Sequence, residues 1–323
     1  MSTARAYYAG SMLKNGTVLV AGGHNGASYL NSAELYDLSR GNWTITGNMN
    51  FFRRSHAASV LLNGTVLVTG GHNTNFLNTA ELYDPSTGNW TTTGNMSMIR
   101  AYHASLVLQN GKVLVAGGHD GSTFLNSAEL YNPSTGTWTT VGNMSSPRRL
   151  PSLIMLTNGV ALMAGGYSGS VFLNSVDLYN SSTQTWVPTG NMNAARGVFT
   201  ASTLHNGLVL AAGGNSGSGY LSSAELYDPS TGVWNMTGSM NNPRAQHTAS
   251  ILPNGMVLVA GGYDGGSYLN SAELYDPSTG IWTTIASMNA SRGYHIAFVI
   301  GNGTALVVGG LVGSSFLNSV ELY

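Results

Sequence analysis

The sequence contains no cysteine and very few charged residues. Without cysteine the chain can form no disulfide, no zinc site with thiolate ligands and no cysteine nucleophile. Charged residues make up 8% of the chain, against roughly 25% in an average soluble protein. Ser, Thr, Asn and Gly must therefore supply most of the polar surface.

Basic clusters and long apolar runs are also missing. Lys14 and Lys112 are the two lysines, the net charge is -1, and no run of basic residues occurs. Nucleic acid is therefore not expected as a partner, because phosphate binding needs clustered cations. No apolar stretch approaches the ~18 residues of a membrane span, and residues 1–5 show no apolar region of a signal peptide.

What the chain does contain is a repeat. Adjacent glycines recur at spacings of 48, 47, 48, 48, 48 and 48 residues, the differences between successive positions 22, 70, 117, 165, 213, 261 and 309. A repeat near 50 residues with Gly-Gly after a short apolar strand is typical of a propeller blade. We expect one domain, residues 1–323, with blades at about 1–48, 49–95, 96–143, 144–191, 192–239, 240–287 and 288–323.

Each unit predicts four short antiparallel strands, A to D. In the second unit strand A ends at Leu62, strand B is 65–68, strand C is 80–83 and strand D is 90–93. An Asn-Gly pair follows every strand A, which favours a two-residue hairpin with positive φ at both positions. The seventh unit ends with strand C, so its outermost strand is missing. This predicts an exposed edge at Asn318–Tyr323 through which the chain self-associates.

The order of residues in each unit resembles the kelch repeat. Gly-Gly is followed by Glu-Leu-Tyr-Asp, then by Trp seven residues past the tyrosine, then by Met and Arg. The resemblance covers essentially the whole chain. It implies an all-β, seven-bladed propeller of the galactose-oxidase-like type. Kelch propellers mostly serve as binding modules and occasionally as enzyme scaffolds.

Most ionisable residues occupy positions that recur in all units. One arginine precedes each strand A, here called the repeat arginine, and one carboxylate lies in each strand C. The arginines are Arg5, Arg53, Arg100, Arg148, Arg196, Arg244 and Arg292, and the carboxylates are Glu34, Glu81, Glu129, Asp177, Glu225, Glu273 and Glu321. We expect them to form buried ion pairs or carboxylate-to-backbone bonds that stabilise the blade.

Positions that vary between units are candidates for ligand binding. Antiparallel order places the D–A and B–C loops at one end of each blade, called here the loop face, and the monotonous A–B and C–D turns at the other. Variable aromatic, histidine and arginine side chains on the loop face suit a peptide or a sugar. The candidate contact residues are Arg54, Arg149, Tyr7, Tyr102, Tyr294, His24, His72, His119, Tyr167 and Tyr263.

Neither a metal site nor a catalytic group is expected. Equivalent positions on neighbouring blades should lie on the order of 10 Å apart, whereas zinc needs donors about 2 Å away. Pairing of His24 or His56 with His72 stays open, but hydrogen-bonding histidines are favoured, and no cofactor is expected. The resemblance to copper-radical oxidases implies a crosslinked cysteine, which this chain lacks. No unique pair of carboxylates offers acid–base catalysis.

These observations predict a non-catalytic module that binds a protein or peptide segment on the loop face. The alternative is an extracellular, lectin-like glycan-binding propeller, followed by a carbohydrate-active enzyme scaffold. The compartment is not determined, although the many Asn-x-Ser/Thr sequons favour an extracellular location. Asn42 and Asn89, which precede tryptophans, are expected to be inaccessible.

Overall fold

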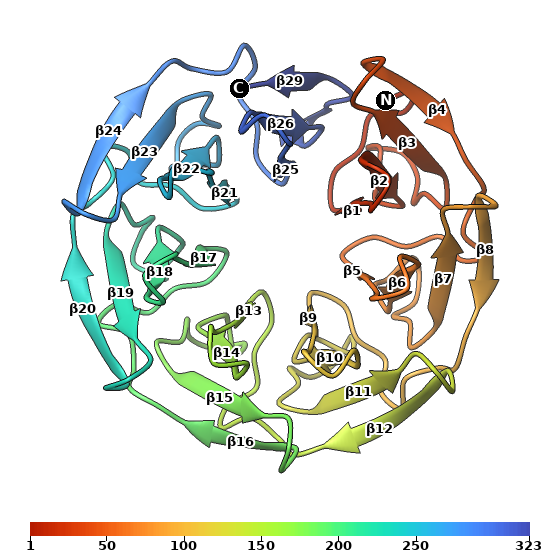
Figure 1. The fold of residues 1–323 in the computed structure, drawn as a ribbon, viewed down its shortest axis with the longest axis horizontal. Helices are drawn as coiled ribbons and strands as arrows, with labels where there is room; N and C mark the ends of the chain where they lie inside the picture. The colour runs from red at the N-terminus through yellow and green to blue at the C-terminus, as the bar shows by residue number, and fades with distance from the viewer. The chain divides into compact units, whose positions relative to one another are not determined.

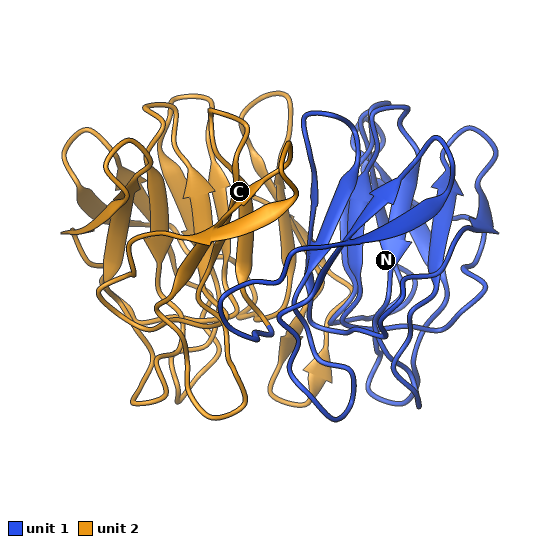
Figure 2. Ribbon diagram, turned by 90° about the horizontal axis from the view of Figure 1, so that it is seen from below, with its two compact units in different colours: residues 1–149 blue, residues 150–323 orange.

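The protein is an all-β, seven-bladed propeller without helices, described over residues 1–323 by a computed structural model. The chain divides into two compact units, Met1–Arg149 and Leu150–Tyr323, which Figure 2 shows in different colours. The single domain that the repeat predicts stays a prediction. No helix is present that could cross a membrane.

Unit 1 contains three four-stranded antiparallel sheets, each in sequential strand order (Figure 1). The first strands of its neighbouring blades lie against one another. Its strands are β1 (Ala9–Met12), β2 (Thr17–Ala21), β3 (Ala33–Asp37), β4 (Asn42–Ile45), β5 (Ala57–Val60), β6 (Val66–Thr69), β7 (Ala80–Asp84), β8 (Asn89–Thr92), β9 (Ala104–Val107), β10 (Val113–Ala116), β11 (Ala128–Asn132) and β12 (Thr137–Val141).

Unit 2 contains blades 4 to 7, and the last blade has three strands in the order β25-β26-β29. A separate two-stranded ribbon, β27 with β28, occupies the B–C loop of that blade. The strands are β13 (Ser152–Met155), β14 (Ala161–Ala164), β15 (Val176–Asn180), β16 (Thr185–Pro188), β17 (Thr200–Thr203), β18 (Val209–Ala212), β19 (Ala224–Asp228), β20 (Val233–Thr237), β21 (Thr248–Ile251), β22 (Val257–Ala260), β23 (Ala272–Asp276), β24 (Ile281–Ile285), β25 (Ile296–Val299), β26 (Ala305–Val308), β27 (Leu311–Val312), β28 (Ser315–Phe316) and β29 (Val320–Leu322).

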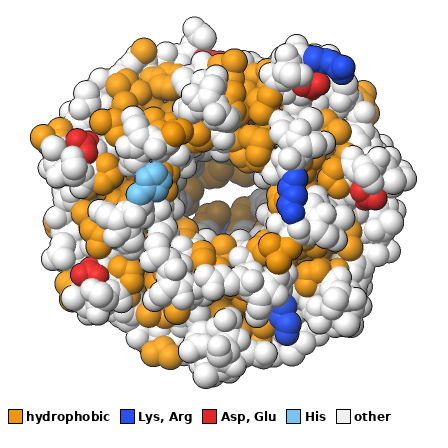
Figure 3. Space-filling model, in the orientation of Figure 1, with side chains coloured by type: hydrophobic (Ala, Val, Ile, Leu, Met, Phe, Trp, Pro, Cys, Tyr) orange, Lys and Arg blue, Asp and Glu red, His pale blue; other side chains and the backbone are white.

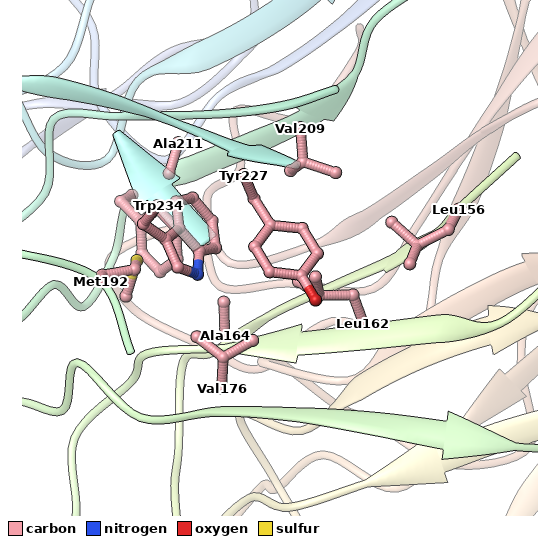
Figure 4. Packing of buried hydrophobic residues seen from close by; sticks show 10 residues of the cluster. Leu156, Leu162, Ala164, Val176, Met192, Val209, Ala211, Tyr227 and Trp234 are labelled. Atoms are coloured by element: carbon pink, nitrogen blue, oxygen red, sulfur yellow. The ribbon is translucent and has the colours of Figure 1, made fainter. Parts of the chain in front are cut away.

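The core lies between the facing sheets of neighbouring blades. Between blades 4 and 5, Leu162 and Val176 pack against Val209, Tyr227 and Trp234 (Figure 4). Such bulky rings fill the space between two sheets that no single blade could bury alone. The second strand of most blades is buried along its full length, as expected for a strand covered on both faces. Figure 3 shows few charged side chains on one face, in keeping with the composition.

The Asn-Gly turns differ from the expected geometry. In the turn after β5 only Gly64 has positive φ, whereas Asn63 does not. Leu61 N donates to Thr65 O and Gly64 N donates to Leu61 O, so the loop has three residues. The prediction of a two-residue turn was therefore wrong. A three-residue loop needs positive φ at one position only, and Asn63 instead accepts hydrogen bonds from Thr65 through its side chain.

The predicted ion pairs are confirmed in six blades. Arg53, fully buried, donates to Glu81 Oε1 at 2.7 Å and to Gly70 O at 2.6 Å. Glu81 also accepts from the backbone N–H groups of Asn50 and Phe51. The pair therefore ties the D–A loop to strand C of the same blade. Its counterparts are Arg5–Glu34, Arg100–Glu129, Arg196–Glu225, Arg244–Glu273 and Arg292–Glu321. In the remaining blade, Arg148 and Asp177 are likewise buried.

Exposure of the asparagines corrects another expectation. Asn42 and Asn89 are both exposed, although each precedes a tryptophan. In β8 the burial pattern alternates, so Asn89 points outward while Trp90 packs inward. Consecutive side chains of a strand point to opposite faces, and this separates the two environments.

Candidate functional site

Strand register brings the variable positions together on the loop face. In blade 2, Ala57 of β5 pairs with Thr69 of β6, so the loop before β5 and the loop after β6 lie at the same end. Isolated bridges continue this pairing beyond the strands, from Arg54 to His72 and from His72 to Phe76. A residue before strand A, a residue after Gly-Gly and an aromatic of the B–C loop therefore lie side by side.

A strained backbone position recurs next to the site in every blade. Left-handed φ values of 52–60° occur two residues after each repeat arginine, at Tyr7, Ser55, Tyr102, Leu150, Val198, Gln246 and Tyr294. Such a conformation costs a non-glycine residue on the order of 1–3 kcal/mol. Ser55 N donates to Tyr7 O at 2.8 Å, and Tyr102 N donates to Ser55 O at 2.9 Å. The main chain thus links neighbouring blades, while the side chain is left to vary.

Arg54 is the centre of the site in unit 1. Its guanidinium carbon lies 5.6 Å from the ring centroid of Tyr7 and 5.2 Å from that of Tyr29. Its Nε donates to His72 Nε2 at 3.1 Å. No carboxylate pairs with Arg54, and its two terminal nitrogens make no hydrogen bond within the chain. Two aromatic rings and one imidazole therefore hold a cation whose outer edge has no partner.

His72 fixes the orientation of Arg54. The side chain is buried, and its ring stacks on Phe76 with centroids 5.1 Å apart. Nε2 contacts both Arg54 Nε and Tyr102 Oη, the latter at 3.2 Å, while Nδ1 lies 3.3 Å from Asn73 O. A neutral ring that donates from Nδ1 and accepts at Nε2 satisfies these contacts. Burial, together with the nearby arginine, lowers the pKa of His72 and keeps the ring neutral.

The arrangement occurs a second time in the same unit. The guanidinium carbon of Arg149 lies 5.6 Å from the centroid of Tyr102 and 5.4 Å from that of Phe124. Arg149, Tyr102 and Phe124 follow Arg54, Tyr7 and Tyr29 by 95 residues each, which is two repeats. Between the two arginines, His119 contacts the rings of Phe76 and Phe124. Burial, followed by the charge of Arg149, lowers the pKa of His119.

His24 completes the aromatic belt of unit 1. Its ring makes a T-shaped contact with Tyr29, 5.3 Å away, and Tyr29 makes another with His72. Tyr29 therefore lies between the two histidines whose pairing the sequence left open. Burial and then Arg54 lower the pKa of His24, so the two arginines carry the positive charge of this face at neutral pH.

Unit 2 presents a different, neutral set of rings. Tyr263 contacts Tyr220 and Tyr268, with centroids 5.3 and 4.9 Å apart, and Tyr167 contacts Phe172. The positions equivalent to Arg54 are Gly197, Ala245 and Gly293. At Gly293 a Cβ would lie 2.9 Å from the Tyr268 ring, so this ring takes the space that a side chain would need. Tyr294 joins its neighbour by a backbone bond to Gln246.

Sequence reasoning missed the aromatic residues of the B–C loops. Each repeat contains one, and in unit 1 these rings flank the arginines. They are Tyr29, Phe76, Phe124, Phe172, Tyr220, Tyr268 and Phe316. Because they recur in all seven repeats, the rule that shared positions serve only the blade excluded them. The recurring aromatic-Leu dipeptide was the signal available.

Histidines elsewhere in the chain do not assemble a metal site. His56, His103, His247 and His295 are buried before strand A, and three of them bond to threonine hydroxyls, as His103 Nε2 does to Thr69 Oγ1 at 2.9 Å. No three His, Cys, Asp or Glu side chains converge as a metal site would require.

Six segments of the chain match a known repeat motif. The kelch motif matches residues 5–50, 53–97, 100–145, 158–193, 196–241 and 243–289. A solved structure titled as a novel fungal alcohol oxidase of the AA5 family, in complex with copper, superposes with a TM-score of 0.81 at 20% identity. The superposition covers 97% of this chain and 71% of that one. No curated protein sequence matches the chain.

The copper in that structure raises the question of whether this chain could hold one. A copper site needs several nitrogen, sulfur or oxygen ligands at one point, and no three His, Cys, Asp or Glu side chains converge here. His72 already uses both ring nitrogens in contacts with protein groups. The residues present do not fit a copper centre, and at 20% identity the likeness shows the fold alone. With six matched motifs and seven blades, the chain belongs to the kelch-repeat family.

Proposed function

We propose that this protein is a non-catalytic recognition module that binds a protein or peptide segment on the loop face of unit 1. The kelch propeller is in general a recognition scaffold. Arg54 carries the proposal: its guanidinium is held between Tyr7 and Tyr29, and no carboxylate of the chain neutralises it. A pre-oriented arginine beside aromatic rings has the composition of a binding hot spot.

The binding chemistry follows from what surrounds Arg54. The rings and His72 fix the guanidinium, so a ligand that bonds to it loses little arginine rotamer entropy. Its terminal N–H groups can donate two parallel hydrogen bonds to a carboxylate. Arg149 occupies the equivalent position two repeats later, between Tyr102 and Phe124. A segment that spans both arginines would gain from two contacts of the same kind.

Affinity capture tests the proposal. Wild type is compared with a variant carrying Arg54→Glu, Arg149→Glu and Tyr102→Ala, using lysate and secreted fraction of the source. We expect proteins that bind the wild type directly, mapped to the loop face by crosslinking, to be lost with the variant. The matched control is Arg40→Glu with Lys112→Glu, which makes the same charge change in the turns at the opposite end. Equal capture by all three proteins would contradict the proposal.

A glycan ligand is the second candidate, favoured by one observation in unit 2. Tyr220, Tyr263 and Tyr268 form a neutral cluster of rings, and an aromatic surface of this kind stacks against sugars. Three results on a glycan array would favour this function. Free monosaccharides should inhibit binding, Tyr263→Ala should abolish it, and Arg54→Glu should leave it unchanged. Binding insensitive to free sugars would favour the peptide.

A further inference from the structure

Large apolar side chains are exposed in two adjacent D–A loops of unit 1. Phe52 in blade 2 is 51% exposed, and Met98 and Ile99 in blade 3 are each 38% exposed. The other D–A loops have small or polar residues or proline at these positions: Thr3-Ala4, Ser146-Pro147, Ala194-Ala195, Asn242-Pro243 and Ala290-Ser291. The repeat therefore does not require apolar residues here, and their exposure is specific to blades 2 and 3.

Hydrogen bonds hold the backbone of these loops in place. Met98 N donates to Glu129 Oε1, and the equivalent Phe51 N donates to Glu81 Oε1, both at 3.2 Å. Asn73 Nδ2 donates to Phe52 O at 3.0 Å. The exposed side chains thus belong to ordered loops tied to buried carboxylates. Apolar side chains held in this way are available for contact with a partner, and exposed apolar patches often mark such contacts.

Of the three exposed apolar side chains, Phe52 adjoins the cationic site around Arg54. Phe52 is two residues from Arg54, and Asn73, which bonds to Phe52, follows His72 directly. In unit 1, Asp120 is the acidic group of the B–C loops, and its oxygens accept hydrogen bonds from Ser122 and Thr123. Burial opposes ionisation of Asp120, but these hydrogen bonds prevail and lower its pKa. The Asp120 carboxylate is therefore already hydrogen-bonded within its own loop and does not pair with Arg54. A carboxylate from a ligand could form that ion pair.

From this juxtaposition we infer that the partner is an acidic segment that also carries bulky apolar side chains. The acidic side chains bind Arg54 and Arg149, and the apolar side chains pack on Phe52, Met98 and Ile99. The inference rests on the proposed function and adds the chemistry of the ligand. A neutral glycan has no carboxylate to pair with the charge of Arg54.

Selection from a random peptide library tests the composition directly. Twelve-residue peptides displayed on phage are selected on the wild-type protein, with counter-selection on the variant carrying Arg54→Glu and Arg149→Glu. We expect enrichment of Asp and Glu interspersed with Leu, Ile, Phe, Met or Trp. A synthetic peptide of the selected sequence should lose tenfold or more in affinity when its acidic residues become amides, and again when its apolar residues become serine.

Variants of the protein complete the test. Phe52→Ser, and Met98→Ser with Ile99→Ser, should each weaken the selected peptide at least fivefold, measured at a temperature where circular dichroism shows each variant to be fully folded. Leu62→Ser, at an exposed leucine in the turn at the opposite end, is the control and should have no effect. Peptides that depend on the arginines but lack apolar enrichment, or bind Phe52→Ser unchanged, would overturn the inference and leave the proposed function standing. Failure to select any arginine-dependent peptide would overturn both.

Discussion

Four histidines at one repeat position show how the same residue meets different surroundings. His103, His247 and His295 bond to threonine hydroxyls, on Thr69, Thr200 and Thr248. His56 is equally buried, but neither ring nitrogen has a hydrogen-bond partner. Ala21 stands where blade 2 has Thr69. An unpaired buried donor costs about 1–3 kcal/mol, so His56 is a local weakness in an otherwise regular repeat.

Supplying the missing partner should stabilise the protein. Ala21→Thr places a hydroxyl where Thr69 meets His103, and we expect a gain of about 1 kcal/mol in the free energy of unfolding. The measurement is urea denaturation. Ala164→Thr is the control. Ala164 packs in a cluster with Phe199, which stands at the repeat position of His56 and offers no polar partner to a new hydroxyl. That variant should lose stability. Equal effects of the two substitutions would contradict the explanation.

The same histidines predict an acid-sensitive fold. Burial, followed by the charge of neighbouring arginines, lowers the pKa of His103 and of His295 to about 3, and shifts the pKa of His56 and His247 well below 6.5. Unfolded histidine titrates near 6.5, so the unfolded chain binds more protons below that pH. Stability should be constant above about pH 6.5 and fall on acidification towards pH 3, by up to ~1.4 kcal/mol per pH unit for each histidine.

Denaturation at pH 7.5, 6.0 and 5.0 measures this slope. His295→Phe copies the residue found at the same position in blade 5. It should reduce the change of the free energy of unfolding with pH by the contribution of one histidine. Arg40→Ala, at an exposed arginine, should leave it unchanged. A stability independent of pH between 7.5 and 5.0 would show that these imidazoles do not stay neutral.

At the scale of elements, the outer ends of neighbouring blades meet through a close backbone contact. Gly94, after β8, donates to Gly136 O at 3.1 Å, and Trp138 Nε1 donates back to Gly94 O at 2.7 Å. A Cβ at position 94 would lie 2.2 Å from Gly136 O. The contact therefore requires glycine for steric reasons. Gly47, Gly190 and Gly238 stand in the same relation to the next blade.

Adding one methyl group there should separate the two elements. Gly94→Ala should lower the free energy of unfolding by about 1–3 kcal/mol, the usual cost of overpacking. Gly219→Ala, where nothing lies within 4 Å of the added Cβ, is the control. Thermal unfolding distinguishes them. If Gly94→Ala has the same melting temperature as the wild type, the close contact does not constrain the blades.

At the scale of the whole molecule, the last blade departs from the other six. Its sheet ends at β29, whose outer edge pairs with no strand, and Leu322 is 60% exposed. In blade 6, which precedes the last blade, the residue that corresponds to Gly94 is Ala286. The residue before it also differs. In blade 2 this residue is Thr93, which hydrogen-bonds to the Tyr131 hydroxyl, whereas in blade 6 it is Ile285, which packs in the same apolar cluster as Tyr323. Alanine thus replaces this glycine beside the sheet that has three strands in the structure.

Restoring a fourth strand should therefore require two changes. A chain extended after Tyr323 by Asp-Pro-Ser-Thr-Gly-Asn-Trp-Thr-Thr should gain thermal stability chiefly when Ala286→Gly is also present, because the alanine Cβ would meet the new turn. Association through Asn318–Tyr323 stays a prediction, and sedimentation should show less self-association in the extended chain. Unchanged melting and sedimentation in the doubly altered chain would contradict both expectations.

Repetition made the fold predictable, whereas the site depended on contacts between repeats. Seven Gly-Gly pairs and the Glu-Leu-Tyr-Asp segments predicted the blades, and the matched Arg and Glu positions predicted the buried ion pairs. Arg54 and Arg149 stood out because they fall outside the repeat. Their neighbours Tyr7 and Tyr102 were also predicted, but Tyr29 and Phe124 were not, because these two occupy a position that is aromatic in every unit.

The sequence alone determined the number of blades, the order of strands and the loops that share a face, because each follows from local patterns repeated seven times. Only the tertiary structure decided which ring lies against which arginine, which histidine lacks a partner and where the backbone adopts positive φ. These features arise between residues of different blades, where a small change in packing decides whether two groups meet. No pattern within a single repeat records such a contact.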